Sequence, residues 1–135
     1  MKFLAVLFSV TLICACGARS TDEEKVHELL ARAEEAAEAR DASDVLAFVA
    51  DDYTDARGFD KNQLRDFLRG YFLMNPKIEL IVDVDDLEFP ADGMAQADVT
   101  VTSLASGGAD RERLRVEFRR YDGDWRVARA DRTRR

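Results

Sequence analysis

Histidine and cysteine are scarce in this chain, and their scarcity excludes several kinds of catalytic site. The 135 residues include one histidine, His27, and two cysteines, Cys14 and Cys16. One histidine cannot complete a zinc site, and the acidic runs at 51–55 and 83–88 lack the spacing and central glycine of a calcium loop. No Gly-x-Ser-x-Gly segment is present either, which argues against a nucleophilic triad. We therefore expect neither a bound metal nor a cofactor.

An excess of positive charge is also missing. The formal net charge of -7 opposes binding to nucleic acid, and we expect no such partner. Arginine is nevertheless concentrated in residues 111–135, where ten arginines face five acids. These arginines either form a basic patch that contacts anionic lipid headgroups, or occupy outer strand positions and pair with acids on neighbouring strands. The candidate patch consists of Arg113, Arg115, Arg119, Arg126 and Arg129.

No hydrophobic run is long enough to span a membrane as a helix. The apolar stretch at 3–13 is well short of the ~20 residues required, but it has the length of a secretory signal and follows Lys2. A buried core helix is the alternative. The next residues, Ile13-Cys14-Ala15-Cys16, resemble the bacterial lipobox, with a small residue before the modified cysteine.

The lipobox resemblance implies a bacterial lipoprotein. Residues 1–15 would be the signal peptide, Cys16 would carry the lipid, and 16–21 would form a lipidated tether. Gly17, in place of aspartate, implies the periplasmic face of the outer membrane. With Cys14 removed and Cys16 acylated, no disulfide is available.

The remaining chain predicts three helices followed by four strands. Helices are expected after the capping residues Thr21, Asp41 and Asp60, and the last is expected to end at Asn75-Pro76. Beyond Pro76 the apolar period changes from 3.6 to 2, with a slip in phase at 85–86 that is typical of a bulge. This order predicts an α+β fold, with three helices packed on a curved four-stranded antiparallel meander.

The order of elements resembles the nuclear transport factor 2-like superfamily, which includes ketosteroid isomerases and scytalone dehydratase. The segments that carry the resemblance are 48–55 and 120–127. It covers residues 22–131 and leaves 132–135 as a basic tail. It implies a cone-shaped domain whose mouth holds a small apolar ligand. The aromatic residues expected either to line that cavity or to fill the core are Phe48, Phe67, Tyr71, Phe118 and Trp125.

The catalytic candidates are Asp55, Tyr53 and His27. Asp55 lies where isomerase-like members of the superfamily place a proton-carrying carboxylate, and Tyr53 or Tyr71 would supply the acid donor that the first helix lacks. The alternative for Asp55 is a solvated or capping acid. His27 is either a general base or an exposed helix residue.

Fold does not determine function in this superfamily. The first hypothesis is a non-catalytic envelope lipoprotein that binds a small ligand, a peptide or a partner protein, with a homodimer as a further expectation. The alternative is a small isomerase or dehydratase that uses Asp55.

Overall fold

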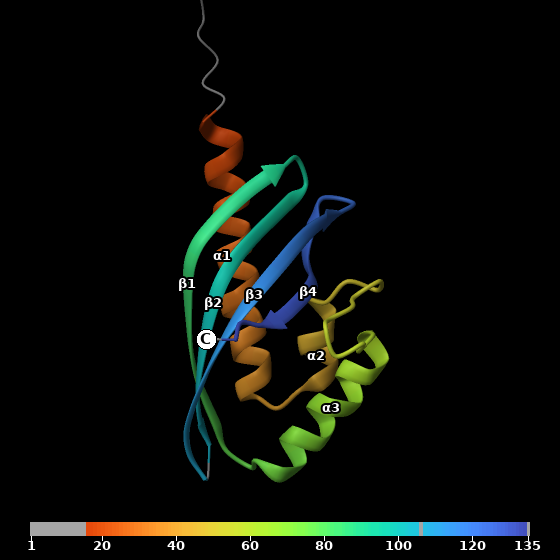
Figure 1. The fold of residues 1–135 in the computed structure, drawn as a ribbon, viewed down its shortest axis with the longest axis vertical. Coiled ribbons are helices and arrows are strands. Elements are labelled where there is room, and N and C mark those ends of the chain that lie inside the picture. Colours follow the sequence, from red (N-terminus) through yellow and green to blue (C-terminus); the bar gives the residue numbers. More distant parts are fainter. Residues whose placement is uncertain (1–15, 106, 135) are drawn as a thin grey trace, which may run out of the picture.

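The computed structural model describes residues 16–105 and 107–134, in which three helices precede one sheet (Figure 1). The elements are α1 (Cys16–Glu38), α2 (Ala42–Ala47), α3 (Lys61–Met74), β1 (Ile78–Ala91), β2 (Met94–Ala105), β3 (Gly108–Tyr121) and β4 (Asp124–Arg132). The strands pair antiparallel in the order β1-β2-β3-β4. The predicted α+β architecture is confirmed. The expected signal peptide at 1–15 lies outside the described residues.

Helix α1 begins earlier than the sequence predicted. It starts at Cys16, so the segment expected to be a tether is helical and Thr21 lies inside the helix rather than at its cap. Alanine and arginine favour helix at 18–19, and a helix that already runs through Thr21 needs no capping box there. The buried side chains of Val26 and Leu29 pack the helix against the sheet. Within the described residues, no helix is both long and apolar enough to cross a membrane.

The predicted caps of α2 and α3 are confirmed. The Asp41 carboxylate accepts a hydrogen bond from the Asp44 amide at 3.0 Å. Asp60 accepts from the Gln63 amide at 2.8 Å, while the Gln63 side chain accepts from the Asp60 amide at 2.9 Å. Each cap satisfies helix N–H groups that have no partner within the helix.

Three register shifts bend the sheet. In β1 the first lies between Asp85 and Glu88, where the slip was predicted, and Asp86 has a φ of 52°. A second follows in β1 between Glu88 and Ala91. In β4 a third shift leaves Ala128 as an extra residue. The sequence analysis predicted only the first of these shifts. Bulges increase local bend and twist, so the strands curve around α1 (Figure 1).

The core lies between α1 and the concave face of the sheet. Its buried members include Val26, Val99 and Phe118, and Trp125 closes one end. Helix α3 is less well covered, since Phe72 is its one buried hydrophobic residue and Phe67 is 44% exposed. The predicted apolar face of α3 is therefore only partly filled by the protein itself, and a cleft lies beside it.

Candidate functional site

A cleft of about 710 Å³ lies between α3, the segment after α2, the first half of β3 and the second half of β4. Apolar side chains form much of its surface: Val49, Tyr53, Leu64, Phe67, Leu114, Val127 and Ala130. Charged side chains complete it, among them Asp55, Arg57, Glu112, Asp131, Arg132 and Arg134. This α3 cleft has the mixture of apolar walls and a few polar groups that is typical of small-molecule sites.

A smaller pocket of about 290 Å³ adjoins the α3 cleft, and the two share Phe67, Glu112 and Arg132. Arg132 and Glu112 form an ion pair at 2.6 Å. The pair therefore stands at the boundary between the two hollows. The Tyr71 and Ser103 hydroxyls are hydrogen-bonded at 3.0 Å along the smaller pocket.

Asp55 is buried at the edge of the α3 cleft and is surrounded by hydrogen-bond donors. Its Oδ1 accepts from the amides of Arg57 at 2.9 Å and Phe59 at 3.1 Å. Its Oδ2 accepts from the Tyr53 hydroxyl at 3.1 Å and from the Arg57 guanidinium at 2.9 Å. The carboxylate, with a side chain only 1% exposed, is thus fully partnered.

These contacts keep Asp55 ionised. Burial by itself would raise the pKa of the carboxyl, but the hydrogen bonds from Arg57, Phe59 and Tyr53 together hold that pKa below its usual value. Burial and the neighbouring Asp55 charge raise the pKa of the Tyr53 hydroxyl, so Tyr53 stays protonated as a donor. A carboxylate in this state is poorly suited to take up a proton near neutral pH.

Arg57 and Phe59 are part of this site, although the sequence analysis did not select them. The Arg57 guanidinium lies 4.3 Å from the centroid of the Phe59 ring and 5.3 Å from that of Phe67. It therefore joins the Asp55 carboxylate to the aromatic surface of α3. The spacing of Arg57 two residues after Asp55 was the available signal, but it does not by itself indicate a buried pair.

His27 does not take part in the α3 cleft. It lies on α1 with its side chain 49% exposed, and its Nε2 is 4.0 Å from a Glu23 carboxylate oxygen one helical turn away. This placement agrees with the alternative of an exposed helix residue. Among the residues that the structure describes, no group of three or more histidine, cysteine or acidic side chains is arranged to hold a metal ion.

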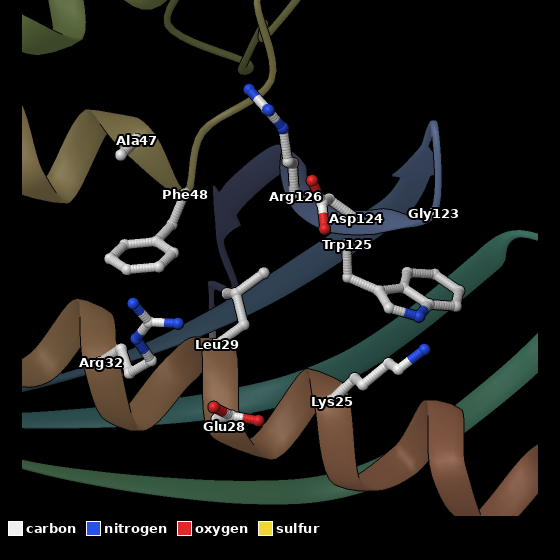
Figure 2. A pocket seen from close by; sticks show the side chains of 10 residues that line it. All are labelled: Lys25, Glu28, Leu29, Arg32, Ala47, Phe48, Gly123, Asp124, Trp125 and Arg126. Atoms are coloured by element: carbon white, nitrogen blue, oxygen red, sulfur yellow. The ribbon is translucent and has the colours of Figure 1, made fainter.

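The five candidate aromatic residues separate into three environments. Phe67 lines both the α3 cleft and the smaller pocket beside it, and Tyr71 lines the smaller pocket. Phe118, by contrast, is 1% exposed in the core. Phe48 and Trp125 line a different pocket of about 380 Å³ between α1 and the β3–β4 turn. Figure 2 shows their rings on opposite sides of Leu29, with the Arg32 guanidinium facing the Phe48 ring at 5.5 Å from its centroid.

The candidate basic patch is partly neutralised. Arg115 pairs with Asp98 across the strands at 3.1 Å, and Arg129 pairs with Asp131. The Arg115–Asp98 contact follows the alternative in which outer arginines pair with acids on neighbouring strands, whereas Asp131 lies on the same strand as Arg129. Arg113, by contrast, lines a polar hollow that adjoins the α3 cleft near the end of β4.

Comparison with known proteins finds solved structures with a similar fold but no protein with a similar sequence. No family model matches the chain, and no curated protein matches it by sequence. A protein of unknown function with a cystatin-like fold from Nostoc punctiforme superposes with a TM-score of 0.69 at 17% identity, covering 84% of this chain and 90% of that one.

Two further structures show the same likeness. A nuclear transport factor 2-like protein of unknown function from Pseudomonas putida has a TM-score of 0.70 at 20% identity, with 84% of this chain and 87% of that one covered. A candidate scytalone dehydratase from Novosphingobium aromaticivorans has a TM-score of 0.71 at 11% identity, with 88% and 89% covered. Together with the three helices and the curved four-stranded meander, these matches show that the chain has the nuclear transport factor 2-like fold.

Proposed function

We propose that this domain binds a small, largely apolar molecule in the α3 cleft without converting it. The observation that carries the proposal is the state of Asp55, which is ionised and already bonded to Tyr53, Arg57 and Phe59 beside an apolar hollow of about 710 Å³. A catalytic carboxylate needs a lone pair free for the proton that it moves, whereas a structural one can shape the wall of a pocket.

The cleft suits a ligand with an apolar body and at least one polar group. Phe67, Leu114 and Val127 offer apolar contact, and Arg57 and Arg132 present guanidinium groups along the same walls. Each guanidinium already has a carboxylate partner, Asp55 for Arg57 and Glu112 for Arg132. A hydroxyl or carbonyl on the ligand therefore complements these two paired guanidinium groups better than a second full negative charge does.

Filling the cleft tests the proposal. Ala130 lines it from β4, so Ala130→Phe places a ring where the ligand would lie. Ala91→Phe, at the exposed end of β1, is the matched control. Native mass spectrometry of the full chain in detergent counts bound Nile red, a neutral apolar probe. We expect one bound probe for the wild type and Ala91→Phe, and none for Ala130→Phe. Equal occupancy in all three chains would contradict the proposal.

The alternative is an isomerase or dehydratase that uses Asp55, and the Tyr53–Asp55 hydrogen bond of 3.1 Å is the observation in its favour. The two functions differ in what becomes of a molecule that co-purifies with the chain. Binding alone leaves it unchanged after long incubation. Conversion that Asp55→Asn abolishes, in a variant that still retains the molecule, would establish the enzyme instead.

The domain is further proposed to be held at a membrane surface through Cys16. The support is the lipobox-like segment before Cys16 in the sequence. A mature chain that begins at Cys16, carries the added mass of acyl chains and fractionates with membranes is expected. Cys16→Ser should abolish processing, and Cys14→Ser should leave it intact. A mature chain that retains Met1 or lacks acylation would contradict anchoring without affecting the cleft.

A further inference from the structure

A second hollow adjoins the α3 cleft near the end of β4 and has a different chemistry. Its volume is about 530 Å³, and polar and charged residues from β2, β3 and the end of β4 line it: Thr100, Arg111, Glu112, Arg113, Arg132, Thr133 and Arg134. We call it the arginine pocket. Four of its seven lining residues are arginines, and one is an acid.

The strand register places these groups together. Thr100 of β2 lies directly opposite Arg113 of β3, and Thr102 lies opposite Arg111. On the other side of Arg113, the Thr133 amide donates a hydrogen bond to the Arg113 carbonyl at 2.9 Å. Because alternate residues of a strand share a face, Arg111 and Arg113 project from the same side of β3. The chain after β4 then brings Arg134 to the edge of that row.

Most of the positive charge in this pocket is not neutralised. Glu112, the one acid in its lining, forms its ion pair with Arg132 at 2.6 Å. Arg111, Arg113 and Arg134 have no ion pair within the described ranges, 16–105 and 107–134. Asp83 of β1 lies opposite Thr100 in the register but does not line the pocket. Three guanidinium groups are thus available to a ligand.

Thr100 adds a hydroxyl group to the same pocket. The residue is 3% exposed and occupies an outer position of β2. In the part of the chain that the structure describes, its hydroxyl has no hydrogen-bond partner. Asp98 Oδ1 is the one side-chain nitrogen or oxygen of the described residues that is both buried and without a hydrogen bond, so the Thr100 hydroxyl is accessible from the pocket. It can therefore donate a hydrogen bond to a group bound there.

From these observations we infer that the arginine pocket binds the phosphate group of a small phosphorylated molecule. Guanidinium groups bind phosphate oxygens in pairs through parallel N–H donors, and the Thr100 hydroxyl supplies a further donor. The source of the phosphate is either a soluble phosphate ester or a phospholipid headgroup. The arginine pocket and the α3 cleft share Glu112, Arg132, Thr133 and Arg134. The inference rests on Arg111, Arg113 and Thr100, which line the arginine pocket and not the cleft.

Titration calorimetry on the full chain in nonionic detergent tests the inference. The probes are glycerol 3-phosphate, as the soluble ester, and a short-chain water-soluble phosphatidic acid, as the lipid source. We expect saturable binding that weakens with added salt, because the guanidinium groups are solvent-exposed. Tighter binding of phosphatidic acid would indicate the lipid source, and equal binding would indicate recognition of the phosphate alone.

Matched variants locate the site. Arg113→Gln should weaken binding about tenfold, while Arg119→Gln, on the same strand and face but outside the pocket, should not. Thr100→Val keeps the shape of the side chain and should weaken binding about fivefold, with Thr102→Val as its control. Circular dichroism spectra confirm that each variant is folded.

Three results would overturn the inference. The first is no binding of either probe by the wild type, and the second is equal loss in Arg113→Gln and Arg119→Gln. The third is concentration-dependent self-association, seen by sedimentation, that Arg113→Gln abolishes, since it would assign the arginines to a contact between two copies of the chain.

Discussion

The Tyr53 hydroxyl donates a hydrogen bond to Oδ2 of Asp55 at 3.1 Å, and both residues are buried. Tyrosine and carboxylate adjacent in a cleft resemble an acid–base pair, but the Arg57 ion pair changes what this contact does. With Arg57 and two amides also bonded to it, the carboxylate fixes the conformation of the segment after α2, and Arg57 joins that segment to Phe67 of α3. The pair is therefore expected to matter first for stability.

The first prediction concerns the loss of the Asp55 charge. Asp55→Asn replaces a carboxylate that accepts from four groups with an amide that directs N–H donors at some of them, and it leaves the Arg57 guanidinium without its partner. We expect the free energy of unfolding in urea to fall by about 3 kcal/mol. Asp66→Asn, at an exposed position of α3, is the control and should change little. Equal stability of Asp55→Asn and the wild type would contradict the structural role.

The second prediction is a pH dependence of that difference. The pKa of Asp55 is lower in the folded chain than the value of about 3.9 for the unfolded one. Its stabilising contribution is therefore complete above that unfolded value and is lost as the pH falls through the folded pKa. The gap in unfolding free energy between wild type and Asp55→Asn should be constant near neutral pH and shrink below about pH 4. If the gap in unfolding free energy widened in acid, the pKa of Asp55 would be raised by folding instead of lowered, and the prediction would be wrong.

The third prediction separates the aromatic residues by role. Phe118→Ala removes a ring that is 1% exposed and should cost about 3–5 kcal/mol of unfolding free energy. Phe67→Ala removes a ring that is 44% exposed and should cost about 1 kcal/mol or less. Nile red occupancy measured by native mass spectrometry should fall in Phe67→Ala. Similar stability losses in the two variants would place Phe67 in the core instead of the cleft wall.

The fourth prediction concerns the attachment of the β3–β4 hairpin to α1. The Trp125 indole N–H donates to an Asp22 carboxylate oxygen at 3.1 Å, and Arg120 donates to the other oxygen at 3.2 Å. Asp22→Ala leaves the indole N–H of the buried Trp125 without its partner and should cost about 1 kcal/mol. Because Trp125 is the one tryptophan in the chain, its fluorescence reports the change directly. Glu23→Ala is the control, and an unchanged emission spectrum in Asp22→Ala would argue against the contact.

Local signals in the sequence determined the elements and their order. The Asp60–Gln63 capping box and the Asp41 cap are interactions over three residues, so they form wherever the chain turns into a helix. The change of apolar period after Pro76 and the slip at 85–86 likewise depend only on neighbouring residues. These signals suffice for an α+β fold with a curved meander, which the structure has.

Tertiary structure alone decided which of those residues form a site. Phe118 and Leu114 follow the same alternation of apolar residues in β3, yet Phe118 lies in the core and Leu114 lines the cleft. The difference arises because the position of α3 determines which part of the sheet is covered. Pairs such as Arg132 with Glu112 lie on different strands and meet through the register of the sheet. The partners of the arginines were likewise decided by long-range geometry. Sequence spacing determines which face of a strand an arginine occupies, but not which acidic side chains of other strands lie beside it.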